Sequence, residues 1–593
     1  MNLLVIVLFS AVVLSLAYRI YGGLLVKLLR LDPKAPMPAV EMRDDNDYMP
    51  VEPKFLLSQH FSAIAAAGPI VGPILAGVAF GWGPALIWIL VGSIFIGGVH
   101  DITALVASVR HKARSIAEVV CQYMTRRSYI LFLIFIWVAL VYIIVAFTDV
   151  VAGSFIGKQT LDDGSVISGG AAATSSMLYL VLPIIMGLLL RYTKLTVGWA
   201  TILFLPLVGV AIYVGPLMPF DLAAILNISD PAAVKVWDVL LLAYCLVAAV
   251  VPVWMLLQPR GHLGGYFLYI AMGAAMLGIL IAGIKSWITG ESTVATITYP
   301  AFTGWVSADG QTLFPMLFIT IACGACSGFH CLIASGTTSK QLRHEGDAKL
   351  IGYGAMLMEG LVAVVSLGCV MMLVQGSATS KLGANAIYAN GIGGFFQQLG
   401  IPMALGYSFG LLAFTTFVYD TLDVCTRLGR YIIQELTGWR SKAGAWFATS
   451  ITAIVPLIFV MLPAQIGADG KAIPAWRVFW GLFGASNQLL AALALVGITV
   501  WLWRTRRQKW VWLVTGLPAV WMYIVSMWAL IIFVKKGFTN KEGAWAMTSN
   551  PVPWAATVLI LLAGMVLIEA IRVFVKDDNK PTGGALIPEP SPA

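Results

Sequence analysis

The chain has 593 residues, of which 59% are hydrophobic and only 11% are charged, and its formal net charge at pH 7 is +9. Its mean hydropathy of +0.88 excludes an ordinary soluble domain. No basic stripe with interleaved aromatic residues accompanies the positive charge, so we expect no nucleic-acid partner and attribute the charge to membrane topology. The composition predicts an all-α polytopic membrane protein in a lipid bilayer, with one integral membrane domain over residues 1–576 and a disordered cytoplasmic tail over 577–593.

Apolar runs long enough to cross a bilayer recur along nearly the whole chain and predict about fifteen transmembrane helices. They are expected at residues 2–26, 61–80, 84–108, 129–150, 177–190, 195–214, 233–257, 266–284, 314–335, 350–374, 403–419, 446–462, 478–502, 510–534 and 553–575. The loops on one side hold 27 Lys and Arg residues and the loops on the other side hold 9. The positive-inside rule then places the N-terminus outside and the C-terminus in the cytoplasm.

The second predicted span contains two Gly-Pro pairs, Gly68-Pro69 and Gly72-Pro73. Proline removes a backbone donor and clashes with the preceding turn, so we expect the helix to break there. Broken backbone at bilayer depth must be covered by protein or line a cavity, which is typical of a transport site. Because unpaired N–H groups at a helix N-terminus favour an anion, these four residues are candidates for binding a substrate carboxylate.

A second proline-interrupted helix is expected in the 233–257 span, where Pro252 is followed by Pro259. It lies five spans after the first, and an odd offset between two broken helices is what an inverted-repeat transporter predicts. We therefore place candidate repeats at residues 58–216 and 233–420, with peripheral helices at 1–30 and 445–576.

Three ionisable residues inside spans are candidates for proton coupling: His100, Asp101 and Glu359. Charge at bilayer depth costs roughly 2.5–3.5 kcal/mol on insertion scales, so each residue needs a partner or a wet cavity. His100 can titrate near neutral pH beside the adjacent carboxylate, and Glu359 lies close to the middle of its span and would be held neutral until a charge pairs with it. The alternative is structural: a pair bonded to neighbouring helices, and a protonated acid bonded to a carbonyl.

A run dense in small residues extends from Ile321 to Ser339, where close helix packing is the simplest interpretation. Ser327 and His330 lie one turn apart on a shared helical face and are further candidates for substrate binding. Three cysteines beside His330 superficially resemble a zinc set, but their spacing within one membrane helix does not match the usual zinc motifs. We expect no metal.

Polar residues near two further spans are interpreted as structural. Asp420 and Asp423 precede Arg427 and Arg430 on one helical face, which predicts a salt-bridge ladder at the membrane edge. Asn487-Gln488 falls inside a later span and is expected to tie helices together.

No phosphate loop and no Ser/His/Asp arrangement occurs, so neither an enzyme nor an ATP-driven pump is indicated. Instead, ordered segments along nearly the whole chain resemble the carbon starvation protein A family of inner-membrane transporters. These segments are residues 60–73, 80–84 with Asp101, 114–118, 258–260, 314–338, 423–427 and 480–492. The resemblance implies a bacterial inner-membrane protein related to leucine-transporter-like transporters of the APC superfamily, with a five-plus-five inverted-repeat core and extra helices. It also implies uptake of pyruvate or peptides during carbon starvation, with H⁺ as the coupling ion and no other cofactor.

Three functions follow as hypotheses. The first is a symporter that imports pyruvate or a similar small carboxylate, with the proton carried by Glu359 or by the His100/Asp101 pair. The second is a peptide transporter on the same scaffold, which needs an acid for the amino group and a larger cavity. The third is a transporter-like nutrient sensor, which would need a cytoplasmic signalling domain where this chain has short loops and a short tail. No oligomeric state is predicted.

Overall fold

The computed structural model describes residues 2–44, 48–160, 166–291, 294–439, 441–466, 472–539 and 543–576, so the predicted tail lies outside the described residues. Its α-helices are α1 (Leu3–Leu29), α2 (Pro38–Glu41), α3 (Pro53–Ile64), α4 (Gly68–Phe80), α5 (Trp82–Gly92), α6 (Gly98–Arg110), α7 (Ile116–Tyr123), α8 (Arg126–Ser154), α9 (Gly169–Tyr192), α10 (Val197–Leu217), α11 (Leu222–Leu226), α12 (Asp230–Val250), α13 (Leu257–Thr289), α14 (Leu313–Thr320), α15 (Gly328–Ile333), α16 (Ala355–Met371), α17 (Ala384–Gln397), α18 (Met403–Thr437), α19 (Lys442–Met461), α20 (Ala475–Arg506), α21 (Leu517–Gly537) and α22 (Pro551–Lys576). Shorter 3₁₀ or π turns are η1 (Ser93–Gly97), η2 (Ala334–Thr338), η3 (Glu345–Asp347), η4 (Lys349–Gly354), η5 (Thr379–Lys381) and η6 (Trp512–Gly516). Two small antiparallel hairpins pair β1 (Lys158–Thr160) with β2 (Val166–Ser168) and β3 (Gln465–Ile466) with β4 (Ala472–Ile473).

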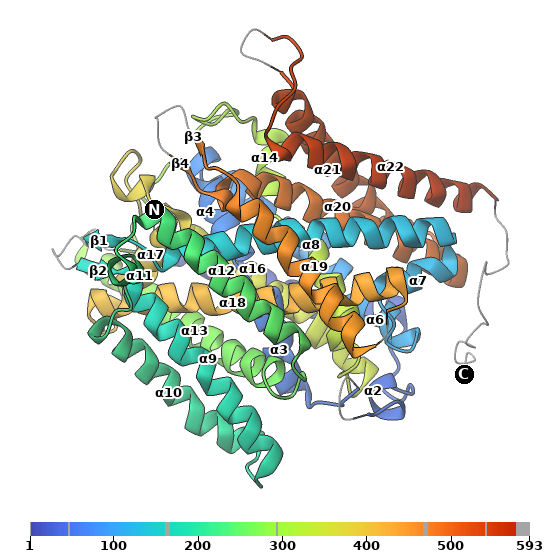
Figure 1. Cartoon of the computed structure of the whole chain (residues 1–593), viewed down its shortest axis with the longest axis horizontal. Helices are drawn as coiled ribbons and strands as arrows, with labels where there is room; N and C mark the ends of the chain where they lie inside the picture. The colour runs from blue at the N-terminus through green and yellow to red at the C-terminus, as the bar shows by residue number, and fades with distance from the viewer. Residues whose placement is uncertain are drawn as a thin grey trace.

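The long helices form one bundle in which most of them run along a common direction (Figure 1). Twelve helices of the described chain are long and apolar enough to cross a membrane, and the bent pair α3 and α4 adds a thirteenth. All of them overlap predicted spans. The two other predicted spans coincide with α14–α15 and with α18. The prediction of an all-α polytopic membrane protein is confirmed, whereas the total of fifteen spans stays a prediction.

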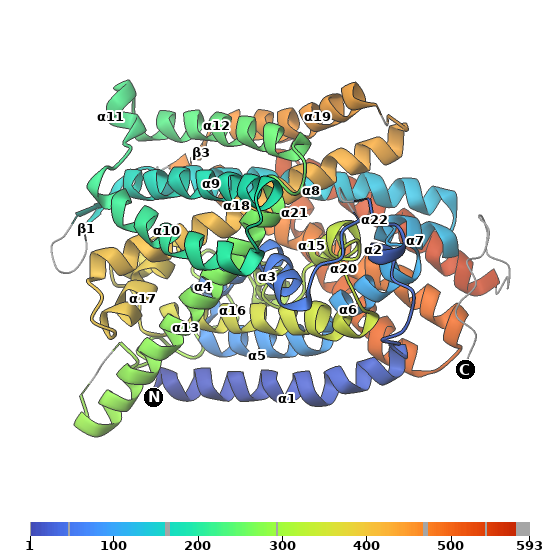
Figure 2. The same cartoon turned by 90° about the horizontal axis from the view of Figure 1, so that it is seen from below.

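Burial separates a core from a rim. In the most apolar stretch of α20, 94% of the residues are buried, and in that of the segment Glu345–Met371 the share is 89%. The corresponding shares are 28% in α1 and 33% in α22. Figure 2 shows α1 along one edge of the bundle, and the red α21 and α22 lie at another edge in Figure 1. The prediction that residues 445–576 are all peripheral is therefore wrong for α20, because the neighbours α8, α15 and α22 cover it.

The first predicted break is present. Helices α3 and α4 are bent by 45° where Ala65–Ala67 separates them. Pro69 lies in the first turn of α4, where its missing N–H costs nothing, and Pro73 lies inside α4. The helix therefore breaks just before the first Gly-Pro pair and continues through the second.

The prediction of a second broken helix at Pro252 is wrong. Helices α12 and α13 are each long and apolar enough to span a membrane, and the proline lies in the short connection between them. The second interruption is instead the segment 321–327, between α14 and α15, in a run that contains no proline. The predicted repeat at 233–420 depended on the misplaced break.

The two interrupted helices lie directly against each other. A Cβ added to Gly68 would meet Cys323 Cβ at 2.2 Å, and one added to Gly72 would meet the Thr320 carbonyl oxygen at 2.5 Å. Only glycine permits this approach of the two backbones. The interruption in one span is thus covered by the other, as irregular backbone at membrane depth requires.

Helix α20 fastens the second interruption. Asn487 Oδ1 accepts a hydrogen bond from Phe329 N at 2.9 Å, and Asn487 Nδ2 donates to Ser327 Oγ at 3.0 Å. Gln488 Nε2 donates to the Phe318 carbonyl at 2.6 Å. The prediction that this Asn-Gln pair ties helices together is confirmed.

Candidate proton-coupling site

Four titratable side chains meet in the interior of the bundle, and we call them the histidine–carboxylate cluster: His100, Asp101, His330 and Glu359. His100 and Asp101 lie on α6, His330 on α15 and Glu359 on α16, and all four are 0% exposed. The Nδ1 groups of His100 and His330 donate to separate Asp101 oxygens at 2.7 and 2.8 Å. His330 Nε2 lies 3.2 Å from Glu359 Oε2. One imidazole therefore bridges two carboxylates that come from different helices.

The links in this cluster differ in quality. Both Asp101 oxygens accept well-formed hydrogen bonds. Among the residues that the structure describes, neither Glu359 oxygen has a hydrogen-bond partner, and the Nε2 atoms of His100 and His330 also lack one. The His330–Glu359 approach is therefore close without hydrogen-bond geometry, and it is the contact in this cluster that a change of protonation would alter most.

No Lys or Arg takes part in these contacts, so protons set the charge of the cluster. Without bound protons the two carboxylates carry −2 and the two imidazoles carry nothing, and two protons bring the sum to zero. Charge that is buried without a partner is costly. The arrangement can hold and release protons, and each release changes the electrostatic attraction of α15 to α6 and α16.

The sequence-predicted residues fall into two groups. His100, Asp101 and Glu359 come together, and His330, predicted as a substrate residue, joins them as the bridge. Ser327 instead bonds to Asn487. Residues Gly68, Pro69, Gly72 and Pro73 are buried, and the first three of them lie against the second interrupted helix. A role of these five residues in substrate binding stays a prediction.

One further histidine lies close to the cluster. His60, on α3, is 1% exposed, and its charge interacts with Asp101 and His330. Its Nδ1 pairs with Thr338 Oγ1 at 2.8 Å, whereas Nε2 has no hydrogen-bond partner among the described residues. The residue lines a cavity of about 40 Å³ shared with Asp420. Such a cavity holds a few water molecules and is far below the roughly 300–1,000 Å³ of a small-molecule site.

A second buried group, which we call the arginine cluster, consists of Arg260 on α13 with Asp420 and Asp423 on α18. Arg260 Nε donates to Asp420, and Arg260 Nη1 lies 2.5 Å from Asp423 Oδ2. The same guanidinium donates to Tyr244 Oη at 2.5 Å and to the Tyr419 carbonyl at 2.8 Å. A permanent cation thus holds both carboxylates.

The arginine cluster corrects two expectations. Asp420 and Asp423 do not form the predicted ladder, because Arg427 donates to the Ala248 and Val251 carbonyls at the end of α12. Arg260 falls between two predicted spans, but it is 0% exposed and is therefore not a loop cation. An acidic pair in a buried helix needs a cation, and that need is a sequence signal for a buried partner such as Arg260.

The cluster also reaches the first broken helix. Ser62, the third residue from the end of α3, donates to Asp420. Helices α3, α13 and α18 are therefore joined next to the interruption at residues 65–67.

Two larger cavities lie toward opposite ends of the helix bundle. The first, of about 490 Å³, is lined by Arg114, Lys340, Glu118 and Glu435 and reaches Ser335 in η2. Its charged residues belong to the basic set of loops or to adjacent helix ends. The second, of about 790 Å³, is lined by residues of the opposite loops and by the beginnings of α12 and α20.

Comparison with known proteins decides the family. The model of the family described as carbon starvation protein CstA matches residues 2–380 and 372–529. The chain belongs to the carbon starvation protein CstA family.

Relatives in this family are named as transporters. The peptide transporter CstA of Bacillus subtilis is 30% identical over 96% of this chain and 96% of the relative. The pyruvate/proton symporter BtsT of Escherichia coli is 30% identical over 92% of this chain and 83% of the relative. The CstA-family chain is thus similar, over most of its length, both to proteins named for peptides and to one named for pyruvate.

Solved structures give more distant matches. A manganese transporter of Eremococcus coleocola aligns with 90% of this chain and 98% of its own, at 14% identity and a TM-score of 0.45. MhsT in complex with L-phenylalanine covers 88% of this chain and 97% of its own, at 12% identity and a TM-score of 0.42.

Proposed function

We propose that this CstA-family protein is a secondary active transporter that imports a small carboxylate such as pyruvate together with protons. The observation that carries the proposal is the histidine–carboxylate cluster, whose members are fully buried and lack a permanent cation. A buried group of this kind binds protons in order to remain neutral. Proton binding and helix contacts are therefore linked at one place.

The coupling follows from where His330 lies. It belongs to α15, the helix that follows the second interruption, whereas its partners belong to the continuous segments around α6 and α16. When the cluster gains or loses a proton, the attraction that holds α15 against these segments changes. Substrate binding at the interrupted helices would favour the protonated arrangement, and reciprocity requires that protons favour substrate binding.

The position of the second interruption, between α14 and α15, changes the bounds of the proposed repeats. We propose that one repeat begins at α3 and the other at α14, since each then starts with an interrupted span. Only 39% and 33% of the residues in the most apolar stretches of α9 and α10 are buried. These two helices would be an insertion at the edge of the first repeat.

We also propose the orientation given by the positive-inside rule, in a bacterial inner membrane. The side whose loops hold the large majority of the basic residues is cytoplasmic. The cavity lined by Arg114 and Lys340 then faces the cytoplasm, and the cavity at the beginnings of α12 and α20 faces outside.

Transport is tested with purified protein in proteoliposomes. Radiolabelled pyruvate should accumulate when the external solution is more acidic, and a protonophore should abolish the accumulation. A gradient of about one pH unit stores about 1.4 kcal/mol per proton, or a tenfold concentration ratio for one-proton symport. Equal pyruvate on both sides despite the gradient, with the protein shown to be active in exchange, would contradict proton symport.

Peptide uptake is the second candidate, because relatives such as the B. subtilis protein are named peptide transporters. The two substrates are distinguished by competition. Excess unlabelled dialanine should leave pyruvate uptake unchanged if the site takes a small carboxylate, and should suppress it if the site takes peptides. Labelled dialanine that accumulates where pyruvate does not would assign the protein to peptides.

A further inference from the structure

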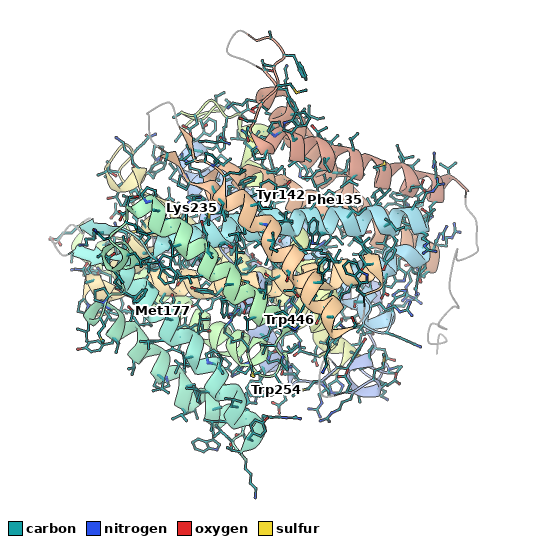
Figure 3. The ribbon with its side chains drawn as sticks, viewed as in Figure 1. Phe135, Tyr142, Met177, Lys235, Trp254 and Trp446 are labelled. Atoms are coloured by element: carbon teal, nitrogen blue, oxygen red, sulfur yellow. The ribbon has the colours of Figure 1, made fainter. Side chains whose placement is uncertain are left out.

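A third group of buried charges lies away from both clusters, toward the side proposed to face outside. Asp149 on α8 is 3% exposed and Asp238 on α12 is 0% exposed, and the two are near enough for their charges to interact. Lys235 lies one turn before Asp238 on α12 and is labelled in Figure 3 near the end of the bundle where that helix begins. Asp149 and Lys235 both line the 790 Å³ cavity.

The two carboxylates have very different surroundings. Asp149 Oδ2 accepts a hydrogen bond from Trp476 N at 2.8 Å, in the first turn of α20. The N–H groups and the dipole of a helix N-terminus stabilise an ionised carboxylate. Neither oxygen of Asp238 has a hydrogen-bond partner in the described part of the chain. Asp149 therefore has the surroundings of an anion, whereas Asp238 has those of a neutral acid.

The nearby cation does not neutralise Asp238 by direct contact. Lys235 Nζ donates to the Val460 carbonyl at the end of α19. The charges that act on Asp238 are Asp149 from α8 and Lys235 from α12 itself, and they oppose each other. With both aspartates ionised the three residues carry −1 in a buried place, and one proton on Asp238 restores neutrality.

We propose that Asp238 is a proton-binding site, separate from the histidine–carboxylate cluster, which exchanges protons with the outer cavity through Asp149. The ligand is the proton, which Asp238 binds as a carboxylic acid beside the ionised Asp149. Because Asp149 lines this cavity, external water reaches Asp149, which passes the proton on to the fully buried Asp238. Proton binding by Asp238 is independent of the proposed transport function. Only its consequence, that Asp238 loads protons from the outside for transport, rests on that function.

Proton binding is tested chemically, without transport. Dicyclohexylcarbodiimide modifies protonated carboxyl groups in apolar surroundings, and mass spectrometry locates the label. In membrane vesicles the peptide with Asp238 should be labelled near pH 6, and the labelling should fall as pH rises. Asp149→Asn removes a like charge, so the labelling midpoint should move to lower pH by about one unit. Absence of the label near pH 6, or a midpoint that Asp149→Asn leaves unchanged, would overturn the proposal.

The transport consequence is tested with Asp238→Asn. Gradient-driven uptake should slow several-fold and lose its dependence on external pH, while pyruvate counterflow at equal pH stays as in the wild type. An external-pH profile identical to the wild type would refute the loading role. If the wild type itself shows no gradient-driven uptake, the proposed function fails, and the labelling experiment still decides whether Asp238 binds a proton.

Discussion

The two buried clusters use opposite means to hold carboxylates inside a membrane protein. In the arginine cluster a guanidinium, which stays charged at any physiological pH, contacts Asp420 and Asp423 directly. In the histidine–carboxylate cluster Asp101 and Glu359 face only imidazoles. In the first arrangement the cation keeps its charge at any physiological pH, whereas in the second the charge changes with each proton. Permanent charge suits a fixed joint between helices, and titratable charge suits a coupling site.

The largest expected effect is on stability, from Arg260→Ala. Removing one partner of a buried ion pair leaves uncompensated charge and typically costs about 3–5 kcal/mol, so the melting temperature in detergent should fall strongly. Adding Asp420→Asn and Asp423→Asn in the same chain should recover much of the loss. The control is Arg477→Ala, because Arg477 and Asp309 form an exposed pair at 3.8 Å. An equal loss in both single variants would contradict the fixed-joint role.

Asp101→Asn should cost less, because the two histidines can remain neutral when their carboxylate is gone. We expect a loss of about 1–3 kcal/mol, as for a buried hydrogen-bonding group that loses its partner. The loss should be larger at about pH 6 than at about pH 8, since a protonated imidazole then lacks its Asp101 partner. Thermal unfolding at the two pH values measures this, and Arg260→Ala should show little such dependence. A pH-independent loss in Asp101→Asn would remove the contrast between the clusters.

An effect of the same order as that of Asp101→Asn, but without its pH dependence, is expected where the interrupted helices touch. In Gly68→Ala the new methyl would lie 2.2 Å from Cys323 Cβ, four residues before Ser327 and seven before His330. Overpacking of this kind costs about 1–3 kcal/mol, and it should displace α15 and slow transport. Gly23→Ala on α1 is the matched control, since its Cβ would meet nothing within 4 Å. Equal melting temperatures and equal uptake rates in the two variants would show that the contact between the interrupted helices has room for the added methyl group.

Much of the fold could be predicted from the sequence, because apolar length and proline position act locally. Every helix that satisfies the spanning criterion overlaps a predicted span, and Pro69 marks the first break to within a few residues. The prediction of a break at Pro252 was wrong because proline can end a membrane span as well as interrupt one. The second break carries no proline, and its glycines and cysteines indicated only close packing.

Most residues of the candidate site could be predicted individually from the sequence, but their assembly into one cluster could not. His100, Asp101 and Glu359 stood out because each places an ionisable group at bilayer depth. That His330 bridges Asp101 and Glu359 depends on contacts across 229 and 29 positions of the chain. Arg260 was missed for the same reason, because its partners lie 160 and 163 positions away. A single sequence shows which groups need partners and not which partners they find.

The central proposal, that protons bound by the histidine–carboxylate cluster drive transport, is tested most directly at Glu359, by measuring proton and pyruvate fluxes together in Glu359→Gln. In proteoliposomes with an internal pH dye, pyruvate addition to the wild type should acidify the lumen and labelled pyruvate should accumulate. The Glu359→Gln protein should lose both signals while it still exchanges internal for external pyruvate, and Glu569→Gln on the peripheral helix α22 should behave like the wild type. Wild-type accumulation and acidification in Glu359→Gln would contradict the account.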